Sequence, residues 1–167
     1  MLAPNTQEPE SFVDGPIDGV VVRPLGVHTD PRGWLVELFR HDELPVENHP
    51  LMAYVSETLP GVVRGPHHHF EQSDYFAFVG PGEFAVYLWD IRVGSPSWGR
   101  RMRLVAGESN KQGVIIPAGV VHAYVNIGDV PGWTFNAANR LYAGEGKHGP
   151  VDEVRHEDRA DSPYRMD

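Results

Sequence analysis

The stretch Gly61-Val-Val-Arg-Gly-Pro-His-His-His-Phe70 carries three consecutive histidines and decides how the fold and the site are interpreted. If the stretch is an extended strand, successive side chains point to opposite faces, so His67 and His69 share one face and His68 takes the other. Short histidine clusters are typical of metal or acid–base sites. The stretch therefore predicts a strand face that carries the imidazoles of both His67 and His69. The alternative is a surface loop in which the histidines have no catalytic or metal-binding role.

A second stretch, from Gly113 to Asn126, is the expected partner of the first across the fold. Pro117-Ala-Gly119 predicts a turn, after which the chain re-enters a strand. By the period of two, His122, Tyr124 and Asn126 fall on one face of that strand. His122 is thus a further candidate imidazole for the same site, and a satisfied core histidine is the alternative.

The composition points to one all-β domain. At 167 residues, the chain fits the length of a single domain with a real core. Its 18 glycines and 15 prolines are far above ordinary usage, while aromatic and β-branched residues are plentiful and spread out. This combination favours many short strands and turns over disorder.

Charge and cysteine content exclude several classes of function. The formal net charge of −9 argues against a nucleic-acid partner, because phosphate binding needs a basic stripe and the sequence has none. Without cysteine, any metal would have to be held by histidine and carboxylate. The sequence has no long apolar run and no signal-peptide pattern, so we expect a soluble cytoplasmic protein without a membrane partner.

The predicted domain spans residues 19–142 and has two irregular ends. Residues 1–18 are polar and proline-rich, which predicts a loose arm that packs late or across a dimer partner, and residues 143–167 are expected to dock as an irregular segment. Residues 41–50 allow one helical turn at most. Short strands bounded by Gly, Pro, Asn or Asp are predicted at residues 20–23, 34–40, 52–56, 62–64, 75–79, 83–92, 101–105, 113–116, 121–125 and 133–136. This pattern indicates a sandwich or a barrel-like jelly roll.

The predicted strand at residues 34–40 holds one carboxylate that its pattern does not explain. Both faces of the strand are largely apolar, and Glu37 is the exception. A carboxylate between apolar neighbours is costly unless it is paired, so Glu37 is a candidate ligand contact. An edge-strand glutamate that reaches solvent is the alternative.

Two motifs resemble those of the cupin superfamily. His67-x-His69 is similar to the first motif, and the spacing Pro-x-Gly-x-x-His-x-x-x-Asn that ends at Asn126 is similar to the second. Four segments resemble, in order, the dTDP-4-dehydrorhamnose 3,5-epimerase family: Asp30-Pro-Arg-Gly-Trp34 with Glu37-Leu-Phe39, Val63-Arg-Gly-Pro-His67, Asp90-Ile-Arg-Val-Gly-Ser-Pro96, and Ile116-Pro-Ala-Gly-Val-Val-His122. The resemblance implies a cupin jelly roll, a homodimer, and an isomerase that acts on a nucleotide-diphospho-4-keto-6-deoxyhexose without a metal cofactor.

The resemblance also implies roles for single residues. In the family a histidine removes a proton next to the keto group and a tyrosine returns one from the other face, and His67 stands at the position of that histidine. Tyr142 stands at the tyrosine that stacks on the thymine ring, with core packing as the alternative. Arginine suits a diphosphate because guanidinium binds phosphate as a bidentate fork, although a surface arginine can also simply tie down a turn. The predicted substrate contacts are Arg32, Glu37, Arg64, His69, Asp74, His122 and Tyr142.

The position of the proton-donating tyrosine departs from the family pattern. Phe135 stands near that position, and a phenyl ring has no proton to give. Tyr124 and Tyr142 are the predicted substitutes, so both are counted as catalytic candidates beside His67.

Two further departures concern the groups around the catalytic histidine. Asp74 replaces a lysine of the family, and the chain ends at Asp167, before the extension that carries the carboxylate orienting this histidine. Asp74 or Glu71 is the predicted replacement for that carboxylate. The segments Asp152 to Arg155 and Pro163-Tyr164 resemble the C-terminal part of a divergent subgroup of epimerase-like cupins. The chain is therefore expected to be complete.

Other functions fit the same residues. A metal-dependent cupin enzyme would hold a divalent ion with His67, His69, Asp74 and His122, because histidine and carboxylate suit several transition metals. A non-catalytic cupin that binds sugar nucleotides is a further hypothesis, since two catalytic parts are replaced. A 3,4-ketoisomerase is a close variant, because that family also carries an Arg-Gly-x-His-x-His segment.

Overall fold

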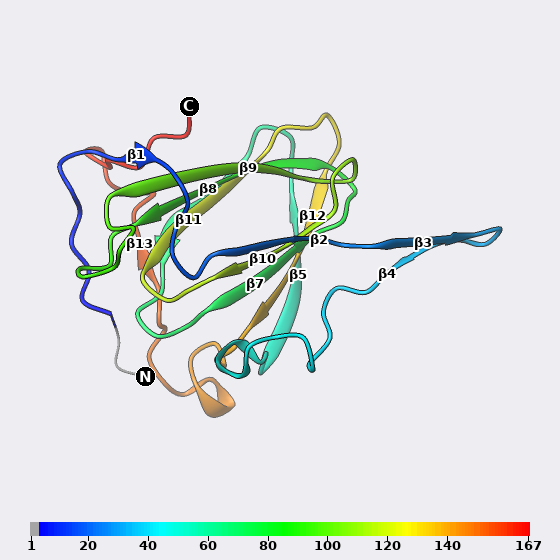
Figure 1. The fold of residues 1–167 in the computed structure, drawn as a ribbon, viewed down its shortest axis with the longest axis horizontal. Helices are drawn as coiled ribbons and strands as arrows, with labels where there is room; N and C mark the ends of the chain where they lie inside the picture. Colours follow the sequence, from blue (N-terminus) through cyan, green and yellow to red (C-terminus); the bar gives the residue numbers. More distant parts are fainter. Residues whose placement is uncertain (1–3) are drawn as a thin grey trace.

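Two β-sheets packed on each other form the body of the computed structural model, within residues 4–167, which the structure describes (Figure 1). The first sheet has the order β1 (Val13–Asp14), β9 (Arg100–Gly107), β8 (Glu83–Asp90), β11 (Val120–Asn126), β6 (Val63–His68) and β13 (Val154–Arg155). The second sheet has the order β2 (Val21–Pro24), β10 (Gln112–Ile116), β7 (Asp74–Phe78), β12 (Gly132–Ala138) and β5 (Met52–Thr58). The prediction of an all-β cupin jelly roll is confirmed.

A hairpin of β3 (Val27–Asp30) and β4 (Gly33–Val36) projects away from the two sheets (Figure 1). Its exposed side chains include Trp34 and Leu35, which are 56% and 58% accessible. The predicted strand at 34–40 ends at Val36, so Glu37 lies just beyond the hairpin. The predicted helical turn is the 3-10 turn η1 (Val46–Asn48), and a second turn, η2 (Glu145–Lys147), lies near the C-terminus.

The main core lies between the two sheets and contains alternate residues of their strands. Phe76 and Phe78 of β7 pack against Phe84, Val86 and Leu88 of β8, and all five are at least 98% buried. Burying a side chain of this size contributes roughly 1.5–3 kcal/mol. Because side chains alternate, the inner row of β7 that holds Phe76 and Phe78 begins with Asp74, a polar residue at the end of the core.

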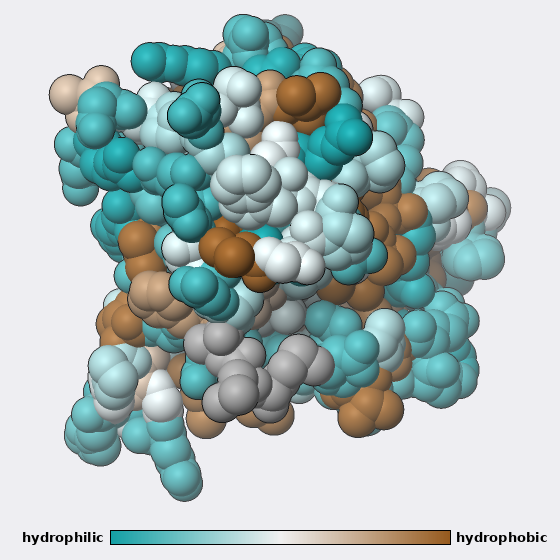
Figure 2. Space-filling view, turned by 60° about the vertical axis from the view of Figure 1, so that its left-hand side comes forward, coloured by the Kyte–Doolittle hydropathy of each residue, from teal (hydrophilic) through white to brown (hydrophobic). Residues whose placement is uncertain are grey.

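Much of the outer face of the first sheet is covered, as is that of the second sheet over β7 and β10, which explains why several strands are apolar throughout. On the first sheet, Trp89 packs against Tyr164 of the C-terminal segment, with ring centroids 5.3 Å apart. Glu8 of the N-terminal arm pairs with Arg159 and accepts a hydrogen bond from Tyr164. Figure 2 turns the side with the chain ends toward the viewer, and its surface is mostly hydrophilic.

The strands extend beyond the predicted domain limits of 19–142. β1 lies in the predicted arm and pairs in parallel with β9, and β13 lies in the predicted C-terminal segment and pairs with β6. Strands of two residues have no period to read, so their sequence gives no signal. The arm begins with residues 1–3, which lie outside the described part of the chain. Within residues 4–167 no helix is long and apolar enough to cross a membrane.

Gly65 allows β6 and β11 to approach each other beside the histidines. Its φ is +82°, and a Cβ there would lie 2.5 Å from the carbonyl oxygen of His122. Gly61 also has a positive φ, +73°, but a Cβ there would meet nothing within 4 Å among the described residues.

Gly65→Ala is therefore expected to lower the free energy of unfolding more than Gly61→Ala does. Gly61→Ala carries only the conformational term of about 1–2 kcal/mol, whereas Gly65→Ala adds a steric overlap with backbone. Urea unfolding of both variants measures the difference. Equal losses for the two variants would contradict the close approach of the two strands.

Candidate active site

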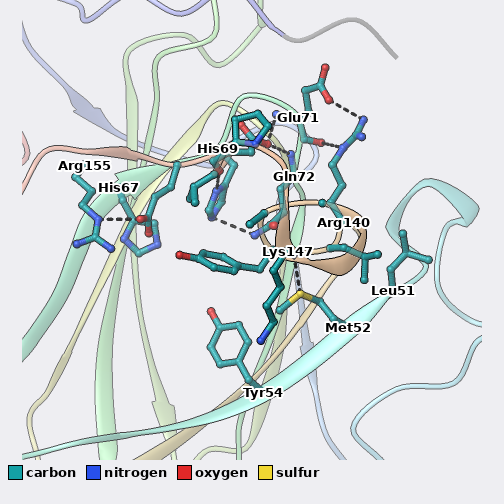
Figure 3. Close-up of a pocket in the computed structure, with 18 of the residues that line it drawn as sticks. Leu51, Met52, Tyr54, His67, His69, Glu71, Gln72, Arg140, Lys147 and Arg155 are labelled. Carbon is teal, nitrogen blue, oxygen red and sulfur yellow. Dashed lines mark hydrogen bonds and ion pairs between the residues drawn. The ribbon is translucent and has the colours of Figure 1, made fainter.

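A cavity of about 1200 Å³ opens at the end of the core where the inner strand positions become polar. Its walls are β5, β6 and β11, together with the segment of residues 140–157 (Figure 3). The inner face of β5 contributes Tyr54 and Ser56, and β11 contributes Tyr124. The volume suits a ligand larger than a single sugar.

Three histidines meet at one side of the cavity. His67 lies directly opposite His122 in the antiparallel pairing of β6 with β11, and their ring centroids are 4.4 Å apart. His69 follows β6, with its centroid 5.6 Å from that of His67 and 5.8 Å from that of His122. His68 points to the opposite face, where it hydrogen-bonds with His156 across 2.9 Å. The predicted division of the triple histidine is confirmed.

Asp74 supplies the buried carboxylate of the site from the other sheet. Its Oδ2 lies 3.3 Å from Nε2 of His69 and 3.6 Å from Nε2 of His122. Its Oδ1 accepts hydrogen bonds of 3.0 Å from the side-chain amides of Gln72 and Asn136. Burial opposes the charge, but these donors and the pairing with His69 outweigh it, and the pKa of Asp74 lies below its usual range.

The His69 ring is held as a cation. Its Nε2 faces Asp74, and its Nδ1 donates to the carbonyl oxygen of Asp152. Burial lowers the pKa of His69, yet these two acceptors outweigh burial and raise that pKa to about 9. Both ring nitrogens of His69 therefore carry protons at neutral pH.

His67 and His122 are neutral at neutral pH. Burial lowers the pKa of His67, and the neighbouring rings of His122 and His69 lower it further. Burial also lowers the pKa of His122, although Asp74 opposes this. Nδ1 of His122 donates to the carbonyl oxygen of Val120 across 3.1 Å, which leaves the lone pair on Nε2. A neutral imidazole on the cavity wall, as at His67, can accept a proton.

The three histidines fit a metal ion in position but poorly in protonation. One ligand atom from each of His67, His69 and His122 lies within 4.8 Å of the others. A metal needs a neutral imidazole, and His69 donates through both nitrogens to Asp74 and Asp152. Binding would therefore have to remove a proton from a group whose pKa is about 9 and break its pair with Asp74.

The structure brings most of the predicted site residues to this cavity. His67, His69 and Tyr124 line it, as do Arg64 and Tyr142, and Asp74 and His122 are buried directly behind its wall. Arg32 and Glu37 lie outside the cavity: Arg32 pairs with Asp30 in the hairpin, and Glu37 lies 3.7 Å from Arg40. One chain alone does not join these two residues to the histidines.

Two details of the expected site need correction. Asp74 is one of the two carboxylates expected to orient His67. In the structure it contacts His69 and His122, the neighbours of His67. Phe135 packs on the outer face of the second sheet with the cluster that contains Leu44 and Tyr75, because the inner positions of β12 belong to Thr134 and Asn136. The packing of the two sheets decides the partners of Asp74, and the register of β12 decides the direction of Phe135; the motif spacing fixed neither.

Several residues of the cavity were not predicted. Tyr54 lies on β5, two positions before Ser56, and its alternation with Ser56 in the predicted strand was the signal available. The other residues had no periodic signal at all, because they come from the segment that follows β12, which is irregular except for η2 and the two-residue strand β13. They are Arg140, Lys147, Asp152, Glu153 and Arg155.

Comparison with known proteins gives the family. The profile described as dTDP-4-dehydrorhamnose 3,5-epimerase matches residues 14–156. The chain belongs to this family. It is 42% identical over 127 residues to a probable low-salt glycan biosynthesis epimerase, Agl13, of Haloferax volcanii, covering 75% of this chain and 81% of the relative. It is 39% identical over 115 residues to the spore coat polysaccharide biosynthesis protein SpsL of Bacillus subtilis, covering 69% and 75%.

Solved structures of the family share the fold. A dTDP sugar isomerase from Desulfovibrio desulfuricans G20 superposes with a TM-score of 0.74 at 26% identity, over 86% of this chain and 87% of that one. A double mutant of the 3'-monoepimerase ChmJ of Streptomyces bikiniensis, solved with dTDP, gives a TM-score of 0.71 at 23% identity, over 89% of this chain and 72% of that one, and supports the fold alone. Membership of the family makes the chain an isomerase of the dTDP-sugar epimerase type.

Proposed function

We propose that the protein epimerises a nucleotide-diphospho-4-keto-6-deoxyhexose, with His67 as the base that removes the proton next to the keto group. The observation that carries the proposal is the neutral imidazole of His67 on the cavity wall, beside the charged pair of His69 and Asp74. As the proton moves to His67, the electrons of the C–H bond form a C=C bond and the keto oxygen becomes an enolate.

The cavity also offers cations for the diphosphate. Arg64, Arg140, Lys147 and Arg155 line it. Arg64 is held by its own hydrogen bonds to Thr58 Oγ1 (2.9 Å) and to the Glu57 carbonyl oxygen (2.6 Å), so its guanidinium is oriented before a ligand arrives. A guanidinium group can donate two parallel hydrogen bonds to two oxygens of one phosphate. A cytoplasmic location for this enzyme stays a prediction.

Turnover of dTDP-4-keto-6-deoxyglucose tests the function. The protein is incubated with this sugar nucleotide, and NMR coupling constants report the configuration at C3 and C5. We expect a product with at least one inverted centre. Recovery of unchanged substrate, from protein that binds dTDP, would contradict an epimerase and favour the non-catalytic binding cupin.

We also propose that the enzyme is a homodimer in which the β3–β4 hairpin carries Arg32 to the cavity of the partner. The hairpin projects from the body, and its apolar side chains Trp34 and Leu35 are more than half exposed. Arg32 itself has a side chain that is 90% exposed. Exposed apolar residues on a projecting hairpin favour an interface with another chain.

Subunit complementation is expected to detect this arrangement. Co-expressed Arg32→Ala and His67→Ala chains, purified through two different tags, form heterodimers with one intact site, so about half of the wild-type activity per dimer returns. In the control pair, His67→Ala with His122→Ala, both changes lie around one cavity and no activity returns. A monomer by analytical ultracentrifugation, or no recovery with the first pair, would contradict the proposal.

A further inference from the structure

An epimerisation needs an acid on the face of the sugar opposite to the base. Among the described residues, the phenols that line the cavity are Tyr54, Tyr124 and Tyr142. His67 stands on β6 of the first sheet, so a group on the opposite side of the ligand must come from the second sheet or from the loop. This geometry separates the three candidates.

Tyr124 is on the wrong side and its hydroxyl is held. It lies on β11, which neighbours β6 in the first sheet, and its residue is 5% exposed. Its hydroxyl lies 3.2 Å from Ser56 Oγ and 3.1 Å from Thr134 Oγ1. Tyr124 therefore joins the two sheets at the floor of the cavity. Tyr142 lies in the loop after β12 and is 55% exposed, which suits a contact near the cavity mouth.

Tyr54 lies across the cavity from His67. It belongs to β5 of the second sheet, paired with Asn136 of β12. Figure 3 shows its ring rising from β5 with the hydroxyl directed into the cavity. Within residues 4–167 this hydroxyl makes no hydrogen bond to another side chain, so it is available to a ligand.

The surroundings of Tyr54 keep its proton in place at neutral pH. Burial raises the pKa of Tyr54, and the nearby charge of Asp74 raises it further. The charge of Arg64 acts in the opposite direction and would stabilise the phenolate formed when the proton leaves. A protonated phenol with a cation nearby is suited to act as a general acid.

We propose that Tyr54 is the general acid of the reaction, a role that rests on the proposed function. After His67 has taken the proton from one face, the C=C electrons of the enolate form a new C–H bond with the Tyr54 proton on the other face, and the keto group is restored. Tyr54 is left as phenolate and His67 as imidazolium. Water then protonates the phenolate and takes the extra proton from His67, so the cycle needs no other reactant.

Tyr54→Phe tests the assignment, with Tyr124→Phe and Tyr142→Phe as matched controls. Each variant is incubated with dTDP-4-keto-6-deoxyglucose in deuterated buffer, and NMR follows both deuterium at C3 and C5 and the configuration of these carbons. We expect Tyr54→Phe to keep deuterium exchange within about threefold, because His67 is intact. Formation of the inverted product is expected to fall by about 100-fold or more, the usual effect of losing a general acid. In both control variants we expect exchange and inversion to change together, so that the ratio of inversion to exchange stays that of the wild type.

The outcomes separate the two proposals. Inversion by Tyr54→Phe at the wild-type rate overturns the role of Tyr54, as does selective loss of inversion in Tyr124→Phe or Tyr142→Phe. If the wild-type protein catalyses neither exchange nor inversion, the proposed function itself is overturned. Circular dichroism and dTDP binding check the fold of each variant. Tyr54→Asn, a second change at this half-exposed position, repeats the test if the first variant does not fold.

Discussion

His67→Ala is expected to reduce proton exchange and epimerisation together, by about 10²–10⁴-fold. The imidazole of His67 is neutral because burial and the adjacent histidine rings lower its pKa, so the wild-type base is unprotonated at neutral pH. Without His67, no other histidine on that part of the cavity wall can act as the base. His122 is buried behind the wall, and His69 is protonated at both nitrogens. Deuterium exchange at C3 and C5 measures the first step directly.

The control for this substitution is His41→Ala, which removes an exposed histidine that does not line the cavity. It should leave exchange unchanged. Affinity for dTDP should also be unchanged in His67→Ala, because the base meets the sugar and not the nucleotide. Exchange by His67→Ala at a rate close to that of the wild type would assign the base to another residue.

Asp74→Asn is expected to lower the free energy of unfolding by about 3 kcal/mol near pH 6. Burial lowers the pKa of His69, and Asp74 is the buried partner that contributes most to raising it from about 6.5 to about 9, with a smaller contribution from Asp152. Each unit of pKa shift corresponds to about 1.4 kcal/mol. In the variant an amide replaces the carboxylate, so the imidazolium of His69 loses its counter-charge. Catalysis should fall as well, since the same carboxylate faces His122.

The stabilisation from the pair of His69 and Asp74 is expected to decrease as the pH rises. A raised pKa in the folded protein stabilises it fully below the unfolded value of about 6.5, and the stabilisation is lost as the pH rises through about 9. The wild type should therefore lose stability between pH 6.5 and 9, and Asp74→Asn should lose much less. Urea unfolding at both pH values measures this, with Asp129→Asn, at an exposed position, as the control. Equal slopes for the wild type and Asp74→Asn would show that the pair with His69 does not stabilise the fold.

The part of the site that lies on regular strands could be predicted from the sequence. The period of two placed His67 and His69 on one face and His68 on the other, and the turn before His122 set the phase of β11. In a strand that is apolar on both faces, the sequence shows which side chains share a face only where polar residues interrupt the apolar run. These histidines are such residues. Their meeting then followed from the pairing of β6 with β11.

Other parts of the site depend on contacts that local sequence does not encode. The partner of Asp74 depends on how the two sheets pack, and the direction of Phe135 depends on the register of β12 with β5. Sequence alone does not assign Tyr54 to the site, because a tyrosine in a short strand is also typical of a core. The residues of 140–157 reach the cavity mainly through a loop, and its Asp152 accepts hydrogen bonds from His69 and from the backbone amides of residues 70–72. No periodic pattern predicts these contacts.

Proton exchange in the absence of metal shows whether this cavity removes a proton from carbon with its own side chains. Wild-type protein, dialysed against a strong chelator and checked for metal content, is incubated with dTDP-4-keto-6-deoxyglucose in deuterated buffer while NMR follows the protons at C3 and C5. We expect deuterium to replace the proton at one or both carbons at the same rate as before chelation. Exchange that is lost on chelation and returns with a divalent metal, or no exchange in either state, would contradict this expectation.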